Sequence, residues 1–395
     1  MSKYNQSGRA LPQHQQTVVF GVPLAEALPE EMRRLSMKRV LVVSTNSLSG
    51  PGGLAETVRN VLGSKFCGLI SGIHPHTPRA DVIRVAKALR DADADGVVTI
   101  GGGSVCDSAK GARLCLANGI TDTVGMDRLR TYHPDFFTNP PKDDPTIAPS
   151  LPFIAIPTTL SAAEFTSGSG ITDERGPVKQ VFLYPHNTPD IVLLDPEMTL
   201  KTPPRLFFGT GMRAVDHCVE AWCSTNATPL SDAQSLHAAQ LLITSLEKVA
   251  TSPNDLQARL DCQAGSWLSV LASAAGVKSG GSHGMGHALG GTAGMAHGET
   301  SCVMLPHILR YNAPANSERQ AVIARALGRG DTPLAEIIAG LVKSLGLPSR
   351  LRDAGVSESV LDAVANAALN DPLVKTNPRP ITELAEIKKL LQAAW

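Results

Sequence analysis

The sequence carries no excess of charge of either sign, no long hydrophobic run and no paired cysteine motif, and each absence excludes a class of protein. Its 36 basic and 36 acidic residues give a formal net charge of zero, so the composition does not favour binding to nucleic acid or to an anionic membrane. No apolar run reaches the roughly 18 residues that a membrane-spanning helix requires. The seven cysteines are scattered, odd in number and without a C-x-x-C pair, which indicates reduced, mostly buried thiols.

The N-terminus is polar and shows neither the hydrophobic core nor the cleavage pattern of a secretion signal. The sequence therefore predicts a cytoplasmic protein with a flexible segment at residues 1–16. With 395 residues, 43% of them hydrophobic, the chain is long enough for two domains that each bury a core.

Residues 17–200 alternate short β-branched or aliphatic runs with amphipathic stretches. This alternation predicts an α/β domain, with a Rossmann-like parallel sheet and helices on its faces. The expected strands are residues 17–20, 40–43, 67–73, 96–100, 152–156, 181–184 and 191–194, and the expected helices are residues 29–34, 55–62, 80–90 and 105–118.

A glycine-rich turn follows the fourth expected strand and reads Gly101-Gly102-Gly103-Ser104. A strand, a glycine turn and a helix in this order present free backbone N–H groups and a helix dipole to a phosphate. The glycines let the backbone approach the ligand closely. The pattern is neither G-x-G-x-x-G nor a Walker motif, so on these residues alone a tight turn without a ligand is the alternative.

Residues 127–150 interrupt the alternation with a proline-rich, polar stretch. Such a composition predicts a long loop or insertion. Two interpretations are open, a cover over a cleft between domains and an inert surface loop.

Beyond Pro204 the strand-like runs end and helical spacing dominates, which predicts an all-helical domain over residues 201–395 with a boundary near residues 195–205. Helices are expected at residues 211–224, 231–250, 257–275, 317–327, 334–345, 357–368 and 384–394. Six of the eleven histidines lie in this region, namely His217, His237, His283, His287, His297 and His307. Histidines that converge on one pocket can bind a metal, move a proton or polarise a carbonyl.

Several motifs occur in an order that resembles one enzyme family. Gly101-Gly-Gly-Ser-Val-Cys-Asp107-Ser-Ala-Lys110 matches the G-G-G-S-x-x-D-x-A-K signature of the iron-containing (group III) alcohol dehydrogenase superfamily. Other matching segments are Leu194–Leu200, Thr210–Met212, His283-x-x-x-His287 with His297-Gly, Leu305-Pro-His307 and Asn377–Pro380. The resemblance implies the dehydroquinate synthase-like fold, with an N-terminal dinucleotide-binding domain, an all-α C-terminal domain, catalysis in the cleft between them, and a homodimer.

The resemblance also locates the residues that hold divalent iron or zinc in metal-dependent members, which are one aspartate and three histidines. The histidine positions fall on His217, His283 and His297, but the aspartate position is occupied by Arg213. Arginine has no lone pair to donate and carries a permanent positive charge. Asp216 is no simple substitute, because one residue of helix turns it about 100° away from His217.

Three segments resemble the maleylacetate reductases, a metal-independent branch of the superfamily. Pro157-Thr-Thr-Leu-Ser-Ala-Ala-Glu164-Phe-Thr166 is similar to their P-T-T-Y-A-G-S-E-M-T, His76-Thr77-Pro78 to their M-H-T-P, and Ser44-Thr45 to their S-T-P. That branch usually has asparagine at the metal-ligand position. Arg213 therefore differs from both patterns.

The resemblance implies roles for residues in the cofactor site. Gly101, Gly102, Gly103 and Ser104 would hold the pyrophosphate of NADH or NADPH. Asp107 would either contact the nicotinamide or ribose or complement the helix N-terminus, and Thr158 and Thr159 would either bond phosphate or ribose or cap a turn. Thr45 takes the place of an acidic residue that would exclude a 2′-phosphate, so both cofactors are allowed. His74 and His76 follow the end of an expected strand, where they would either line the cofactor groove or lie outside it.

His217, His283, His287 and His297 are the candidate catalytic residues, and without a metal a histidine can protonate the substrate as hydride arrives. His287 would face the nicotinamide or only support its neighbour, and His237 and His307 are interpreted as structural. Arg213 has two interpretations. It forms a structural ion pair, for example with Asp216 or Glu220, or it binds a substrate carboxylate bidentately.

Three hypotheses follow. The first is a metal-independent NAD(P)H-dependent reductase of maleylacetate reductase type, which acts on an activated C=C or C=O of a small, acidic ring-cleavage product. The second is a conventional iron or zinc alcohol dehydrogenase with metal on His217, His283 and His297. The third is an inactive homologue that binds nucleotide.

Overall fold

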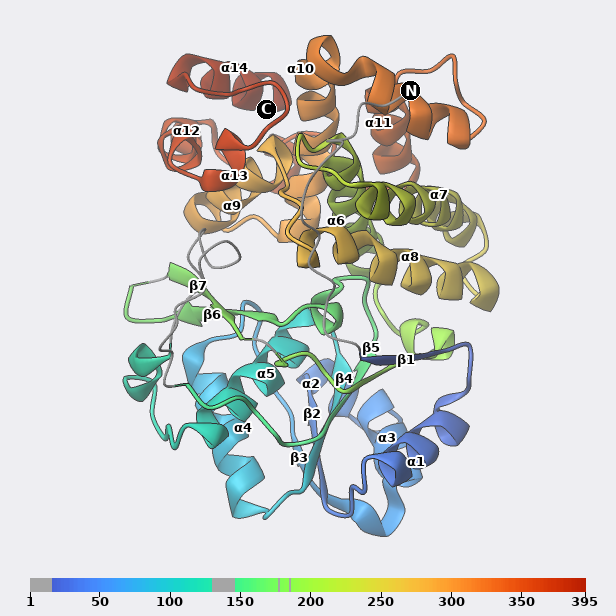
Figure 1. Ribbon diagram of the computed structural model, residues 1–395, viewed down its shortest axis with the longest axis vertical. Helices are drawn as coiled ribbons and strands as arrows, with labels where there is room; N and C mark the ends of the chain where they lie inside the picture. Colours follow the sequence, from blue (N-terminus) through green and yellow to red (C-terminus); the bar gives the residue numbers. More distant parts are fainter. Residues whose placement is uncertain (1–15, 130–145, 177, 185) are drawn as a thin grey trace. The chain divides into compact units, whose positions relative to one another are not determined.

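The computed structural model describes residues 16–129, 146–176, 178–184 and 186–395 (Figure 1). Most of the expected loop at residues 127–150 and nearly all of the expected flexible N-terminus lie outside these residues. The described chain divides into two compact units, residues 16–201 and residues 202–395.

The first unit is built on a six-stranded sheet with the strand order β1-β8-β5-β4-β2-β3, and every strand pair is parallel. The strands are β1 (Thr17–Phe20), β2 (Val40–Ser44), β3 (Phe66–Ile70), β4 (Gly96–Gly101), β5 (Phe153–Pro157) and β8 (Ile191–Leu194). Strands β2, β4, β5 and β8 are buried along their whole length, as expected for parallel strands covered on both faces. The predicted α/β fold class is confirmed.

Helices connect these strands, and most begin and end within a few residues of the predicted bounds. They are α1 (Leu24–Arg34), α2 (Asn46–Ser49), α3 (Leu54–Leu62), α4 (Arg79–Asp91) and α5 (Gly103–Ala117). One core cluster packs residues of α1 and α3 against β2, β4, β5 and β8. The same four strands end at one edge of the sheet, where ligands bind in open α/β folds.

A two-stranded antiparallel hairpin, β6 (Gly168–Asp173) and β7 (Val178–Leu183), lies outside the main sheet. The sequence predicted a strand near β7 but none at β6, because Gly168-Ser-Gly-Ile-Thr-Asp lacks an apolar run. A buried arginine secures the hairpin, since the Arg79 guanidinium donates to the Gln180 side chain at 2.6 Å and to Asp127 at 2.6 Å.

The second unit contains helices and no strand among its described residues, 202–395. The helices are α6 (Pro204–Cys223), α7 (Pro229–Thr251), α8 (Leu256–Ala274), α9 (Gly281–Ala293), α10 (His297–Ala326), α11 (Leu334–Ser344), α12 (Leu361–Leu369), α13 (Pro372–Lys375) and α14 (Leu384–Ala394). None of the helices in the described part of the chain is long and apolar enough to cross a membrane.

Two helices that carry candidate histidines differ most from the sequence-based expectation. Helix α9 was not predicted, because it contains five glycines and glycine has a low intrinsic helix propensity. Helix α10 begins 20 residues before the predicted 317–327 helix and bends at Asn316, whose φ of −145° is not helical. Both differences concern the histidine-bearing segments, so the local context of the candidate site could not be read from helical spacing alone.

Candidate active site

The glycine turn lies at the carboxyl end of β4, between the ends of β2 and β5. Gly101 has a φ of +154°, a conformation that favours glycine. Its carbonyl accepts a hydrogen bond of 3.0 Å from the Thr158 amide, which ties the turn to the loop after β5. The turn leads directly into α5, so the first N–H groups of a 15-residue helix point out of this edge.

Two buried hydroxyl groups beside this turn have no hydrogen-bond partner among the described residues, the Oγ1 of Thr159 and the Oγ of Ser161. A Cβ at Gly102 would come within 3.1 Å of Thr159, and a Cβ at Gly103 within 3.1 Å of Ser161. Buried hydroxyls normally bond to a partner. Two unbonded hydroxyls next to free helix N–H groups therefore fit a bound pyrophosphate. The sequence motifs predicted Thr158 and Thr159 as cofactor-site residues but not Ser161, because its place in the loop after β5 was the only signal for it.

The other candidate cofactor residues have partners within the first unit. Thr45 directly follows β2, and its hydroxyl bonds to the hydroxyl of Ser47 at 2.9 Å. Asp107 accepts a bond of 3.0 Å from the Gly170 amide of β6 and lies 3.2 Å from the Lys110 ammonium, so this carboxylate connects α5 to the hairpin.

The histidines that follow β3 differ in their surroundings. His74 bonds through Nδ1 to Asp81 at 3.0 Å, and its side chain is largely exposed. His76 and Thr77 have positive φ values of 65° and 54°. Left-handed backbone is costly for a β-branched residue such as Thr77. Two bonds to Thr172 of β6 hold this turn, one from the Thr172 amide to the Thr77 carbonyl and one from its hydroxyl to the His76 carbonyl.

A buried acid lies in the loop beside the glycine turn. Glu164 is 3% exposed, and burial raises its pKa to about 7, against the opposing effects of its own backbone N–H and of Lys110. Lys110 is itself buried and donates to the carbonyls of Ala163 and Gly168 at 2.6 Å each. Glu164 therefore changes its charge near neutral pH.

Glu164→Gln is expected to remove a pH dependence of stability. A carboxyl group whose folded-state pKa is raised stabilises the fold only while it stays protonated, and that contribution is lost as pH rises through the folded-state value. The wild-type free energy of unfolding should therefore fall by about 3 kcal/mol more than that of Glu164→Gln between pH 4.5 and pH 8. Urea unfolding at several pH values measures this difference, with Glu26→Gln on the exposed side of α1 as the control. Parallel pH profiles for wild type and Glu164→Gln would contradict it.

In the second unit, close backbone packing brings α10 against α6. A Cβ at Gly298 would come within 2.5 Å of the carbonyl carbon and oxygen of Gly209, so only glycine permits this approach. Gly286 and Gly290 make similar room on α9. A Cβ at Gly286 would lie 3.7 Å from the Arg213 Nη1, and one at Gly290 would lie 3.1 Å from the His297 ring. Since Gly286 and Gly290 are one helical turn apart, Arg213 and His297 pack against neighbouring positions of one face of α9.

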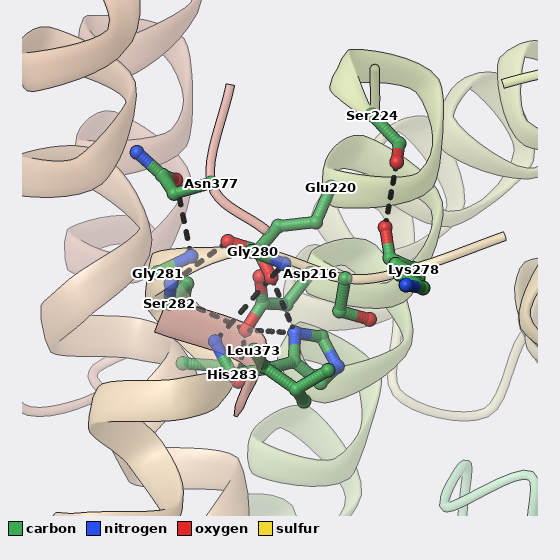
Figure 2. A network of polar contacts seen from close by, with 12 residues as sticks. Asp216, Glu220, Ser224, Lys278, Gly280, Gly281, Ser282, His283, Leu373 and Asn377 are labelled. Atoms are coloured by element: carbon green, nitrogen blue, oxygen red, sulfur yellow. Dashed lines mark hydrogen bonds and ion pairs between the residues drawn. The ribbon is translucent and has the colours of Figure 1, made fainter. Parts of the chain in front are cut away.

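Glu220 of α6 fixes the start of α9 (Figure 2). Its two carboxylate oxygens accept N–H bonds from Gly280 at 2.7 Å, Ser282 at 2.8 Å and His283 at 3.3 Å. An acidic side chain from another helix thus satisfies the free N–H groups at this helix N-terminus. Glu220 also bonds to the Nδ1 of His283 at 2.8 Å, which sets the direction of that ring.

Asp216 is fully buried and contacts all three helices of the site. Its Oδ2 accepts hydrogen bonds from the hydroxyls of Ser282 on α9 at 2.8 Å and Ser301 on α10 at 2.6 Å. The same oxygen lies 3.5 Å from the His283 Nδ1 and 3.7 Å from the Arg213 Nη1. Burial opposes ionisation of Asp216, but His283, Arg213 and Ser301 outweigh it and lower its pKa.

His217 and His283 face each other, with ring centroids 5.0 Å apart. Burial lowers the pKa of His217, and the nearby His283 and Arg213 lower it further. Burial and the charge of Arg213 also lower the pKa of His283. Asp216 and Glu220 raise it by more, so the pKa of His283 lies above its usual value. The His217 Nδ1 and the His283 Nε2 are buried and bond to none of the described residues.

The remaining candidate histidines separate into different environments. His287, one turn after His283, is half exposed and bonds to Asp371 of the short helix α13 at 3.0 Å. His297 is the first residue of α10. His307 is partly buried further along α10, and His237 is exposed on α7. The structure therefore brings together Arg213, His217 and His283, with His297 against the same helix.

Comparisons with known proteins identify the family. The family model described as "Iron-containing alcohol dehydrogenase" matches residues 15–196, and the one described as "Fe-containing alcohol dehydrogenase family, C-terminal" matches residues 207–395. The chain belongs to the iron-containing alcohol dehydrogenase family. It is therefore an oxidoreductase, as the sequence motifs predicted.

Individual relatives match the chain over nearly its whole length. The chain is 33% identical to Dehydrogenase FUM7 of Gibberella moniliformis, covering 95% of this chain and 96% of that protein. It is 32% identical to a maleylacetate reductase of Pseudomonas knackmussii, covering 95% of both chains. The crystal structure of maleylacetate reductase from Rhizobium sp. strain MTP-10005 superposes with a TM-score of 0.80 at 29% identity, covering 98% of this chain and 99% of that one. These matches confirm the resemblance to the maleylacetate reductase branch.

Membership in the family implies a divalent metal, and the helical unit supplies only part of a site for one. The unbonded nitrogens of His217 and His283 are suitable donors. The position that the sequence motifs predict for the family's aspartate, however, carries the guanidinium of Arg213, whose positive charge already acts on both rings. A cation at this corner adds repulsion where a carboxylate would offset the metal charge. The residues present therefore do not fit the divalent metal of the family.

A second group of possible ligands is Asp216, Glu220 and His283, whose donor atoms all lie within 4.8 Å of one another. Glu220 is saturated by N–H donors at the start of α9, and it also bonds directly to His283 at 2.8 Å. A cation here would have to break bonds that define the start of the helix. This group is a hydrogen-bonded anchor for His283.

Proposed function

We propose that this protein is an NAD(P)H-dependent reductase of maleylacetate reductase type that works without a metal. Hydride from the nicotinamide C4 would reduce an activated C=C or C=O of a small substrate that carries a carboxylate. The observation that carries the proposal is the Arg213 guanidinium at the family's metal-ligand position, next to His217 and His283.

The glycine turn supplies the cofactor site in this proposal. The N–H groups at the start of α5 would bind the pyrophosphate, and the hydroxyls of Thr159 and Ser161 would complete its hydrogen bonds. The Thr45 side chain carries no charge, so it excludes neither NADH nor NADPH. Asp107 would act by holding β6 against α5, through its bond to Gly170.

The helical unit supplies charge and a proton. Arg213 would bind the substrate carboxylate, since a guanidinium offers parallel N–H donors that match two carboxylate oxygens. His283 would be the proton donor, because its Nδ1 is held by Glu220 and its Nε2 is open. Reduction of a C=C bond then balances, with hydride added to one carbon and the proton to the other. His217 and His297 would line the same site, and His287 would support α9 through Asp371.

A conventional alcohol dehydrogenase is the second candidate. The three histidines at the family's ligand positions favour it, because two of them keep an unbonded ring nitrogen. In that case the substrate would be a neutral aldehyde or ketone and a metal would polarise its carbonyl. The third hypothesis, an inactive homologue that binds nucleotide, conflicts with the oxidoreductase family to which the chain belongs.

Steady-state assays with two substrates test the proposal. Purified protein with NADH, and separately with NADPH, is expected to reduce maleylacetate with a kcat/KM at least about 100-fold above that for a neutral aldehyde of similar size, since two charge-assisted bonds favour the acid. NADH oxidation at 340 nm measures both rates. Faster reduction of the neutral aldehyde would support the second candidate instead.

A further inference from the structure

Ser301 makes the one hydrogen bond by which the described protein residues hold the Arg213 guanidinium. The Arg213 Nη1 donates to the Ser301 Oγ at 3.2 Å, and the hydroxyl of Ser301 donates in turn to the Asp216 Oδ2 at 2.6 Å. The hydroxyl can fill both roles because it has one proton and two lone pairs. The chain of contacts runs from α6 to α10 and back to α6.

The rest of the guanidinium is open. No further hydrogen bond joins Arg213 to the described part of the chain, and its side chain is 14% exposed. Arginine has five N–H donors in a rigid plane. A bond at one corner of this plane therefore fixes where the others point, and the others remain available to a ligand.

Asp216 attracts the guanidinium by its charge but does little to orient it, because the 3.7 Å between them is too long for a hydrogen bond. Two serine hydroxyls hold the Asp216 carboxylate instead. Ser282 bonds to the same Asp216 oxygen as Ser301 does, at 2.8 Å, but makes no bond to Arg213. The two serines are both fully buried. Both hydroxyls bond to Asp216, but only that of Ser301 also bonds to the guanidinium.

We propose that Ser301 is a positioning residue that aims the open N–H donors of Arg213 at a carboxylate of the substrate. This inference rests on the proposed function, since it assumes that Arg213 faces an acidic ligand. Affinity for the acidic substrate would then depend on the neutral hydroxyl of Ser301 on α10 as well as on the charge of Arg213. In this role the hydroxyl acts on the substrate through Arg213, to which it is bonded.

Ser301→Ala and Ser282→Ala form a matched pair for testing this role. Each removes one buried hydroxyl and one bond to Asp216, so each has a similar effect on folding. Succinate, a dicarboxylate that cannot be reduced at a C=C bond, serves as the probe in calorimetric titrations of the full-length protein with NADH bound. Ser301→Ala is expected to raise the Kd of succinate about tenfold, as for loss of one bond that orients a charged group. Ser282→Ala is expected to change it less than about threefold.

Turnover assays of the same proteins separate this inference from the proposed function. Ser301→Ala should raise the KM for maleylacetate and leave kcat within about twofold, because orientation for binding is lost while the histidines are unchanged. If wild type binds succinate in a Ser301-dependent way but does not reduce maleylacetate, the proposed function fails and the positioning role stands. Equal succinate Kd values for the two serine variants, or no succinate binding by wild type, would overturn the positioning role whatever the turnover shows.

Discussion

Arg213→Met is expected to raise the KM for maleylacetate about 100-fold and to change kcat much less. A charge-assisted hydrogen bond contributes about 1.5–3 kcal/mol, and a bidentate guanidinium–carboxylate pair contains two. The carboxylate is bound in the ground state and in the transition state alike, so its loss appears mainly in KM. Steady-state kinetics with NADH at saturation measures the effect. Methionine fills a similar volume, so that the partly buried site between α6, α9 and α10 is not opened.

Two controls identify the cause of this change. Arg213→Lys keeps the charge but loses the planar pair of donors, and its KM should lie between those of wild type and Arg213→Met. Reduction of a neutral aldehyde should be unaffected by either substitution. If Arg213→Met leaves the KM for the acid unchanged, Arg213 is only a structural partner of Asp216.

Arg213→Asp is expected to create a metal site that wild type lacks. The substitution replaces a cation by a carboxylate four residues before His217, and so supplies the aspartate that the motif resemblance predicts beside the three histidines in a metal-dependent member. It also places a second carboxylate three residues before the buried Asp216, and this repulsion makes a bound cation more favourable. Zinc in excess should raise the melting temperature of Arg213→Asp by about 3 °C, as for a ligand at roughly 100 times its Kd.

Arg213→Asn is the matched control, because it removes the cation without adding a carboxylate. Its melting temperature should respond to zinc much less than that of Arg213→Asp, and wild type should not respond. A zinc-induced rise of the same size in wild type and in Arg213→Asp would show that the guanidinium does not oppose metal binding.

The parallel sheet and its glycine turn could be predicted because they depend on local signals. Buried runs such as Val40–Val43 and Gly96–Ile100 are continuous and hydrophobic, and the residues that follow them fall at one edge of the sheet by topology. The family motifs located Arg213, His217, His283 and His297 in the same way, as short segments in a fixed order. The hairpin strand β6 and helix α9 had no such signal, because glycine weakens both helical and strand patterns.

The connections between the site residues could not be predicted, because they join positions far apart in the chain. Helix geometry turns Asp216 away from His217, which disfavours Asp216 as a replacement for the missing metal ligand. The same rotation directs it toward Ser282 and Ser301, which are 66 and 85 residues away. Glu220 likewise meets the start of α9 across about 60 residues. Residue spacing predicts on which face of a helix a side chain lies, but only the folded structure shows which residues pack against that face.

Metal analysis of active wild-type protein decides whether the guanidinium of Arg213 takes the place of a divalent metal in an acid-reducing site. Mass spectrometry would measure the iron and zinc content of one preparation, and maleylacetate turnover would be assayed before and after chelator treatment. We expect far less than one metal per chain and the same kcat in both assays. Near-stoichiometric iron or zinc, with activity lost to the chelator and restored by the metal, would contradict it.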